Sequence, residues 1–439
     1  MPRTRCPPAV PYHSPIRNSK RRKPPMVESE IPANDRTDSA PPTALGQGES
    51  STAPNHWPAP RSLYVHVPFC RHRCGYCNFT LIAGRDERIE DYLRALRVEL
   101  ETVPLAAPLD TLFFGGGTPT HLPLRQLERL WTAVLERVAL QSDAEVCFEA
   151  NPSDLLDDEK LKLLSSLGVN RVSLGVQSLQ PRKLRLLERD HDAATVTQVV
   201  ERARGLFRSL SIDLIFATPE ETLSDWLADL SQALALPIDH LSTYSLTIEK
   251  GTRFWNRWRA GFLQRAEEDL EAMLYEATID QVVSRGWEHY EVSNFARPQH
   301  RSRHNEVYWT DRGYYAVGPG AARFVDGVRS VNHRSTFTWL RRLAEGTSPV
   351  EEQETIDAEQ RARDRFVFGL RRLEGIDLRE FQRVTGIEAS QLAPRAWDRC
   401  LEQGWLEITD SSRLRLTRAG LLISDSLWGD FLQTWSEQA

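Results

Sequence analysis

The chain has few cysteines, no long apolar run and no excess of positive charge. Its 439 residues include only six cysteines, too few for a disulfide-stabilised scaffold and typical of a reducing compartment. No apolar stretch approaches the roughly 18 residues that a transmembrane helix needs, and the first residues lack the apolar core of a secretory signal. A formal net charge of −6 gives no general attraction for nucleic acid. We therefore expect a soluble cytoplasmic protein that does not bind nucleic acid.

The first sixty residues are rich in proline and contain 13 of the 26 prolines of the chain. This composition cannot bury enough apolar surface to offset the entropy lost on ordering, so residues 1–60 are predicted to be a disordered leader. We interpret the basic run RNSKRRK at 17–23 as solvated charge within this leader rather than as a nucleic-acid tail. Met26 is an alternative to Met1 as the start of the natural protein.

From residue 62 onward, segments typical of strands alternate with amphipathic segments typical of helices. Predicted strands cover 62–69, 111–116, 145–150, 171–178, 211–217 and 240–247, and predicted helices cover 87–100, 124–138, 157–167, 194–207 and 225–235. Six strand-then-helix units predict an α/β fold with a parallel sheet, either an open partial (β/α)6 barrel or a flat doubly wound sheet. In both layouts, ligands bind at the C-terminal ends of the strands.

The remainder of the chain predicts a further helix at 264–285, a strand at 288–296 and a separate C-terminal unit. That unit is a helical tract followed by a hairpin at 405–410 and 413–418, which is typical of a winged-helix-like domain. From residue 358 it carries 12 Arg and Lys against 13 Asp and Glu, so a docking or lid role is favoured over DNA binding. The predicted units are 61–300, a connector at 301–350, and 351–439.

Three of the cysteines, Cys70, Cys74 and Cys77, lie within eight residues directly after the first predicted strand. Three thiolates can hold three irons of a [4Fe–4S] cluster and leave the fourth iron open to the amine and carboxylate of S-adenosylmethionine. Zinc bound with help from His66 or His72, and thiol redox chemistry at Cys74 and Cys77, are the alternatives. The spacing favours the cluster, because no second zinc-ligand pair follows and a redox pair leaves Cys70 unexplained.

The stretch YVHVPFCRHRCGYCNF resembles the radical S-adenosylmethionine superfamily, and within it the oxygen-independent coproporphyrinogen III oxidase group and its haem-chaperone branch. Six further motifs support the resemblance: FFGGGTPT (113–120), EANP (149–152), RVSLGVQS (171–178), IDLI (212–215), YEVSNFA (290–296) and HNEVYW (304–309). It runs from about residue 62 to the C-terminus. It implies the barrel fold of radical S-adenosylmethionine proteins, with a [4Fe–4S] cluster, S-adenosylmethionine and haem as cofactors. It also implies recipient haemoproteins, an electron donor and peripheral contact with membrane respiratory enzymes as partners.

The resemblance further implies which residues contact S-adenosylmethionine. Glycines at the end of the second predicted strand let the backbone approach a ligand closely. Carboxylates and amides suit the ribose hydroxyls and the amine, and an arginine suits the carboxylate of the cofactor. The expected contacts are Tyr64, Tyr76, Gly116, Gly117, Thr118, Glu149, Gln177, Arg189, Asp213 and Thr247.

The motif HNEVYW is associated with haem binding in the haem-chaperone branch. His304 is the expected axial ligand, with Tyr308 and Trp309 offering flat faces to the porphyrin, and a core histidine is the alternative. The rival functions are oxidative decarboxylation of coproporphyrinogen III and radical chemistry on some other substrate. Phe79 stands where the oxidases have a fourth cysteine, and the leader has no counterpart of their substrate-side segment, which counts against the first rival.

Overall fold

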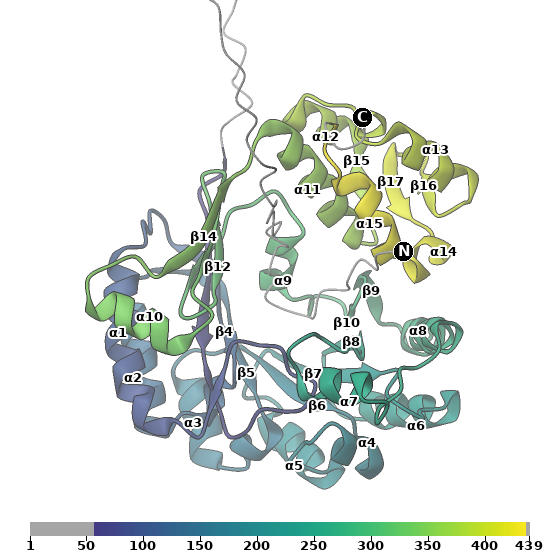
Figure 1. Ribbon diagram of the computed structural model, residues 1–439. Coiled ribbons are helices and arrows are strands. Elements are labelled where there is room, and N and C mark those ends of the chain that lie inside the picture. The colour runs from purple at the N-terminus through teal and green to yellow at the C-terminus, as the bar shows by residue number, and fades with distance from the viewer. Residues whose placement is uncertain (1–56, 436–439) are drawn as a thin grey trace, which may run out of the picture.

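The computed structural model describes residues 57–435, and its largest element is a nine-stranded sheet (Figure 1). Its strand order is β11-β1-β4-β5-β6-β7-β8-β10-β9. The six central strands are β1 (Ser62–Val67), β4 (Leu109–Gly116), β5 (Leu140–Ala150), β6 (Arg171–Gln177), β7 (Ser209–Phe216) and β8 (His240–Ser245). They are parallel and lie side by side in chain order. Since a doubly wound sheet reverses its strand order, this order confirms the partial barrel.

The barrel stays open because other strands occupy its two edges. At one edge, β11 (Tyr315–Val317) pairs parallel with β1. At the other, β10 (Asn294–Ala296) pairs antiparallel with β8, and β9 (Glu288–Glu291) lies outside it. The prediction of one strand over 288–296 is therefore wrong: the segment is a hairpin. Its turn is held by the Glu291 carboxylate, which accepts a hydrogen bond from the backbone N–H of Ser293 at 3.0 Å.

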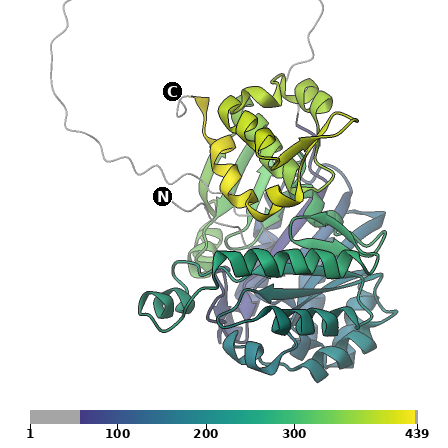
Figure 2. The same cartoon turned by 90° about the vertical axis from the view of Figure 1, so that its right-hand side faces the viewer.

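Helices cover the outer face of the barrel (Figures 1 and 2). They are α1 (Ile89–Glu101), α2 (Leu124–Leu135), α3 (Asp158–Ser166), α5 (Ala193–Ala203), α6 (Leu223–Leu234) and α8 (Glu268–Val283). Side chains alternate across each strand, so Leu63 and Val65 of β1 join the large core beneath these helices. Tyr64, between them, packs inside the barrel with Phe113 and Cys147. The inner face is thereby left for side chains that contact ligands.

A small sheet and a helix follow β11 along the chain. The sheet contains β12 (Ala322–Val325), β13 (Val328–Asn332) and β14 (Val350–Thr355), and α10 (Thr336–Ala344) lies beside α1. The buried Glu99 carboxylate of α1 accepts hydrogen bonds from Gly318 N at 2.8 Å, Asn332 Nδ2 at 2.5 Å and Trp339 Nε1 at 3.0 Å. This single side chain therefore fastens the added elements to the barrel.

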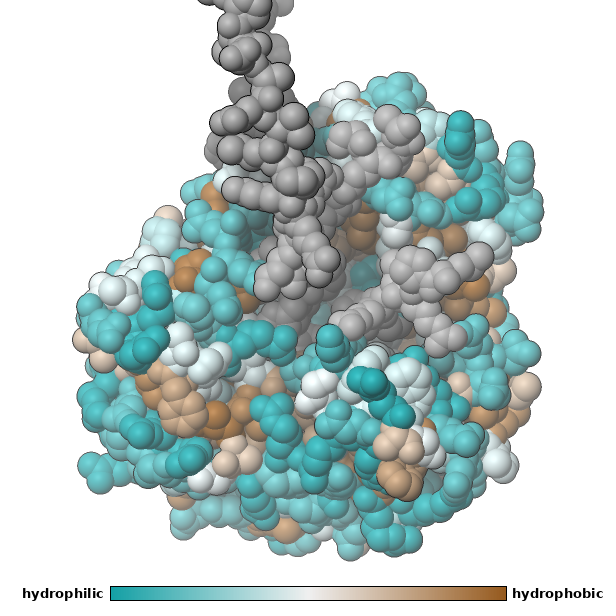
Figure 3. All heavy atoms as spheres, viewed as in Figure 1, coloured by the Kyte–Doolittle hydropathy of each residue, from teal (hydrophilic) through white to brown (hydrophobic). Residues whose placement is uncertain are grey.

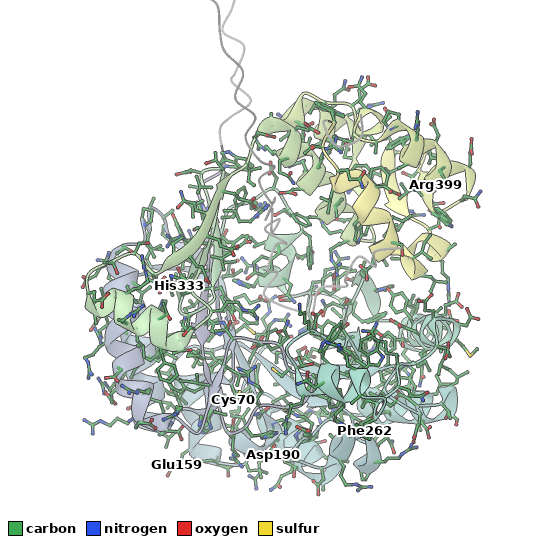
Figure 4. The ribbon with its side chains drawn as sticks, in the orientation of Figure 1. Cys70, Glu159, Asp190, Phe262, His333 and Arg399 are labelled. Carbon is green, nitrogen blue, oxygen red and sulfur yellow. The ribbon has the colours of Figure 1, made fainter. Side chains whose placement is uncertain are left out.

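The C-terminal domain has the predicted helices followed by a hairpin. Its elements are α11 (Ala358–Arg371), β15 (Ile376–Asp377), α12 (Leu378–Thr385), α13 (Pro394–Glu402), β16 (Leu406–Ile408), β17 (Arg413–Leu416), α14 (Arg418–Leu422) and α15 (Ser424–Leu432). In Figure 4 this domain, with Arg399, lies at the end of the molecule away from Cys70. It is tied to the rest by a buried ion pair between Arg361 and Asp311 at 2.5 Å.

Most of the predicted disordered leader, including the basic run and Met26, lies outside the described residues. Trp57, near its end, packs edge-on against Phe324 with ring centroids 4.7 Å apart. No described helix is both long enough and apolar enough to cross a bilayer. The face of the molecule seen in Figure 3 is mainly hydrophilic, with scattered apolar patches.

Candidate functional site at the C-terminal ends of the barrel strands

The cysteine segment lies where the strand-end rule places a ligand site. After β1 the chain enters β2 (Phe69–Cys70), which pairs with β3 (Ile82–Ala83) and so closes the intervening segment into a loop. Cys70 lies in the lower part of the view in Figure 4, on the side of the molecule away from the C-terminal domain. The loop therefore sits over the C-terminal end of β1, next to the end of β4.

The three cysteines of this loop are free thiols, two of them buried. Cys70 Sγ lies 3.0 Å from Thr118 Oγ1, and Cys74 Sγ lies 3.5 Å from His72 Nε2. Burial raises the pKa of the Cys70 thiol to about 12, and the neighbouring thiols add to this effect. Burial likewise raises the pKa of Cys77 to about 11. Both thiols therefore stay protonated near neutral pH until a bound cation favours the thiolate.

The donor chemistry of the loop fits an iron–sulfur cluster. Within residues 57–435, no three His, Cys, Asp or Glu side chains converge on one ion position. Cluster ligands bind different irons, so they need not converge in this way. Inside the loop, a Cβ added at Gly75 would lie 2.6 Å from the Phe254 ring, and Phe254 N donates to Gly75 O at 2.9 Å. The loop is thus held tightly against α7 (Arg253–Arg259).

The glycines at the end of β4 lie directly against the cysteine loop. Gly116 has a φ of +112°, and a Cβ there would lie 2.5 Å from His66 Cε1. A Cβ at Gly117 would lie 2.6 Å from Phe69 O. Thr118 N donates to Phe69 O at 2.8 Å. Glycine is therefore required at Gly116 and Gly117 because the His66 ring and the Phe69 backbone occupy the space that a Cβ would take.

Two half-buried carboxyl groups face the barrel interior from β5 and β7, the strands on either side of β6. Glu149 accepts a hydrogen bond from Gly116 N at 2.9 Å, and Asp213 lies 3.3 Å from Ser173 Oγ. Burial raises the pKa of Glu149 to about 8, and the charge of Asp213 raises it further against the opposing Gly116 hydrogen bond. Burial raises the pKa of Asp213 to about 6. Both groups therefore exchange protons near neutral pH.

Arg189 links the strand ends to the cysteine loop. Its Nη1 lies 3.6 Å from Cys74 Sγ, and its Nη2 donates to Gly175 O at 2.6 Å and to Asn151 Oδ1. Asn151 Nδ2 in turn donates to Thr118 Oγ1 at 3.3 Å. The buried Nε of Arg189 has no hydrogen-bond partner, so one donor stays available for a ligand. Asn151 was not among the predicted contacts, although it stands inside the EANP motif.

The other predicted contacts lie around the same end of the barrel. Gln177 ends β6 with a φ of +67°, and Thr247 follows the end of β8 by two residues. The ring of Tyr76 is 6.2 Å from that of Phe254. Tyr64 lies deeper, and its hydroxyl is 3.0 Å from His66 Nδ1. His66, weighed from sequence only as a zinc ligand, instead supports both Tyr64 and the glycine turn.

His304 lies inside the barrel, on α9 (Arg303–Tyr308), and is fully buried. Its Nδ1 lies 2.7 Å from Thr111 Oγ1 and its Nε2 lies 2.9 Å from the Tyr308 hydroxyl. Its ring stacks on Phe113 at 4.9 Å, and burial lowers its pKa to about 3. Both ring nitrogens are therefore engaged, and a metal could bind this imidazole only after one of these hydrogen bonds breaks.

Comparisons with known proteins agree with this architecture. Residues 64–233 match the radical SAM superfamily and residues 356–423 match the HemN C-terminal domain. The haem chaperone HemW of Lactococcus lactis is 34% identical over 374 residues, which cover 85% of this chain and 97% of that protein. HemW of Bacillus subtilis is 34% identical over 377 residues, which cover 85% and 99%. The solved structure of coproporphyrinogen III oxidase HemN from Escherichia coli, with a TM-score of 0.75, 22% identity and coverage of 86% and 91%, shows the same fold.

Proposed function

The chain belongs to the HemW family of radical SAM proteins, and from this membership we propose that it is a cytoplasmic haem chaperone. The observation that carries the proposal is the 34% identity to HemW proteins over 85% of the chain, which also covers 97% of the relative from Lactococcus lactis. The proposed activity is to bind haem and pass it to recipient haemoproteins. An electron donor and respiratory enzymes at the membrane are its proposed partners.

A [4Fe–4S] cluster is proposed to be held by Cys70, Cys74 and Cys77. The supporting observations are that the loop lies within the segment matching the radical SAM superfamily, that its cysteines form no disulfide, and that it has no fourth cysteine. When bound, such a cluster supplies single electrons to the sulfonium of S-adenosylmethionine. The chain's own part is to supply the thiolates and to hold the loop against Phe254 and Thr118.

S-adenosylmethionine is proposed to bind at the C-terminal ends of the strands, beside the glycine turn and the carboxyl groups of Glu149 and Asp213. The glycine turn lies directly against the cysteine loop, and the unpartnered Nε of Arg189 offers a donor to a carboxylate. Glu149 and Asp213 can accept hydrogen bonds from hydroxyl and ammonium groups when ionised. Tyr64, Tyr76, Thr118, Gln177 and Thr247 complete the proposed set.

Haem ligation by His304 is proposed to require opening of α9. The imidazole is neutral, as a haem ligand must be, but its nitrogens are taken by Thr111 and Tyr308. Haem must therefore displace one of these hydroxyls and reach a fully buried ring. We propose four units: a leader at 1–60, a barrel at 61–300, a connector at 301–350 and a C-terminal domain at 351–439. Helix α9 belongs to the connector rather than to the barrel, which is consistent with its opening.

The test is an anaerobic haem titration followed by its Soret absorption. The native protein should develop a saturable Soret band, and His304→Ala should weaken binding at least about tenfold. His333→Ala is the matched control, because it removes an imidazole that lies away from α9 (Figure 4). Haem-loaded protein should then transfer haem to a haem-free b-type cytochrome.

The outcomes separate the parts of the proposal. Absence of a Soret band from the native protein would overturn the chaperone function. An unchanged affinity in His304→Ala would overturn only the role of this residue. Formation of protoporphyrinogen from coproporphyrinogen III, in the presence of S-adenosylmethionine and a reductant, would instead support the oxidase function.

A further inference from the structure

A polar pocket lies at the opposite end of the barrel from the cysteine loop. Its volume is about 320 Å³. Its lining includes Glu145, Arg171, Arg208, Ser209, Glu288 and, just before and at the start of α9, His300, Arg301 and Arg303. Arg171, Ser209 and Glu288 are the first residues of β6, β7 and β9, so the pocket opens at the N-terminal ends of these strands. It is therefore separate from the site at the C-terminal ends.

The lining of this pocket carries an excess of positive charge. Four arginines stand against two glutamates, and both glutamates are already paired. Glu145 accepts from Arg171 Nε at 3.0 Å, and Glu288 accepts from Arg301 Nε at 2.8 Å. Arg303 lies 3.4 Å from the exposed carboxylate of Asp143. The remaining guanidinium, that of the exposed Arg208, forms no ion pair or hydrogen bond within the described residues.

Buried polar atoms of the lining also lack hydrogen-bond partners. Arg171 is 4% exposed, and its Nη2 donates to two backbone carbonyls, but its Nη1 has no partner. Ser209 Oγ and His300 Nδ1 are likewise buried and unpaired. Buried polar groups are normally satisfied, so three unpaired atoms around one pocket indicate a missing polar ligand or water. Two of them, the Arg171 and Ser209 groups, are donors suited to an oxyanion.

We propose that this pocket binds a small molecule through a carboxylate or phosphate group. Its oxygens would accept from Arg171 Nη1 and Ser209 Oγ, and the exposed guanidinium of Arg208 would pair with the anion. The volume is at the lower end of the range for small-molecule sites, which suits a compact metabolite. The proposal is independent of the proposed haem function.

The test is calorimetric titration of the full-length protein with inorganic phosphate and, separately, with succinate, at constant ionic strength. At least one of the two anions should bind saturably. Comparison of the phosphate titration with the succinate titration identifies whether a phosphate or a carboxylate group is recognised. Arg208→Ala and Ser209→Ala should each weaken binding at least about tenfold. Arg204→Ala, which removes an exposed arginine outside the pocket, should leave the affinity unchanged.

Two results would overturn the proposal. The first is the absence of saturable binding of either anion, which would leave water as the occupant of the pocket. The second is equal weakening in Arg204→Ala and Arg208→Ala, which would show general attraction to positive charge. Because Arg208 is exposed, its substitution does not threaten the fold.

Discussion

Arg189 Nη1 lies 3.6 Å from Cys74 Sγ, so the network at the strand ends and the cysteine loop form one connected unit. The same guanidinium donates to Gly175 O and to Asn151, whose amide continues to Thr118 and from there to Cys70. The thiols are positioned by the backbone of their loop rather than by Arg189. A change at Arg189 should therefore affect the proposed S-adenosylmethionine site more than it affects the thiols.

Arg189→Lys should weaken S-adenosylmethionine binding at least about tenfold, because one ammonium cannot replace a planar fork that reaches several acceptors. The iron and sulfide contents should stay close to those of the native protein. Equilibrium dialysis and metal analysis measure the two quantities. Arg185→Lys, at an exposed position of α4 (Pro181–Leu186), is the control. An unchanged affinity in Arg189→Lys would contradict the proposed contact.

Cys70→Ser, Cys74→Ser and Cys77→Ser should each lose most of the bound iron and sulfide after anaerobic reconstitution. A cluster that is held by only three cysteine ligands is not retained when one of these ligands is removed. Cys400→Ala, which removes a buried thiol of α13, should retain the iron of the native protein. Zinc in place of iron, or retention of iron by all three serine variants, would refute the proposed ligand set.

Gly116→Ala should destabilise the protein more than Gly168→Ala. Both glycines have positive φ, at +112° and +85°, so both alanines strain the backbone. At Gly116 the new Cβ would also lie 2.5 Å from the His66 ring, whereas at Gly168 no other atom lies within 4 Å of the new Cβ. The ring cannot move easily, because His66 Nε2 lies 2.7 Å from Thr80 O. The extra loss of unfolding free energy should be about 1–3 kcal/mol, measured from urea midpoints.

The central fold could be predicted because its strand-like segments alternate regularly with amphipathic helical segments along the chain. The segment 288–296 was mistaken for one strand because its turn depends on a side chain: the Glu291 carboxylate organises Ser293 only in the folded hairpin. β11 was missed because it has three residues, and its register is set by pairing with β1. Short elements of this kind carry too little periodicity to be recognised locally.

The candidate site likewise contains features that local sequence predicts and features that depend on contacts between distant segments. The cysteine loop and the glycine turn could be predicted because their chemistry is local in sequence. The roles of Asn151 and His66 could not, because they arise from contacts between segments far apart in the chain: Asn151 with Arg189, and His66 with the space above Gly116. The engagement of both His304 nitrogens depends on Thr111, which is 193 residues away in the chain.

Haem binding should raise hydrogen exchange in α9, Arg303–Tyr308. Ligation by His304 must break its hydrogen bond to Thr111, which holds α9 against β4, or its hydrogen bond to Tyr308, which lies within α9 itself. Exchange measured by mass spectrometry, with and without haem, should show faster exchange in α9 and no change in α2. Saturable haem binding with unchanged protection of α9 would place the haem elsewhere.

Glu149→Gln should stabilise the cofactor-free protein at pH 8 relative to the native chain, and have little effect at pH 5. Burial raises the pKa of Glu149 to about 8 in the folded protein, above its ordinary value of 4.5. Folding therefore favours the protonated form, and this contribution to stability is fully present below the unfolded pKa and is lost as pH rises through the folded pKa. Glutamine does not titrate, so it avoids the cost of a buried charge.

The gain of the Glu149→Gln variant over the native chain should grow between pH 5 and pH 8 by on the order of 1–3 kcal/mol. Denaturant midpoints of both proteins at the two pH values provide the measurement. Glu159→Gln on α3 is the control, because its side chain is exposed to solvent and its neutralisation should leave this difference small (Figure 4). A gain that is equal at pH 5 and pH 8 would mean that Glu149 does not titrate in this interval. The effect of the substitution would then come from packing rather than from charge.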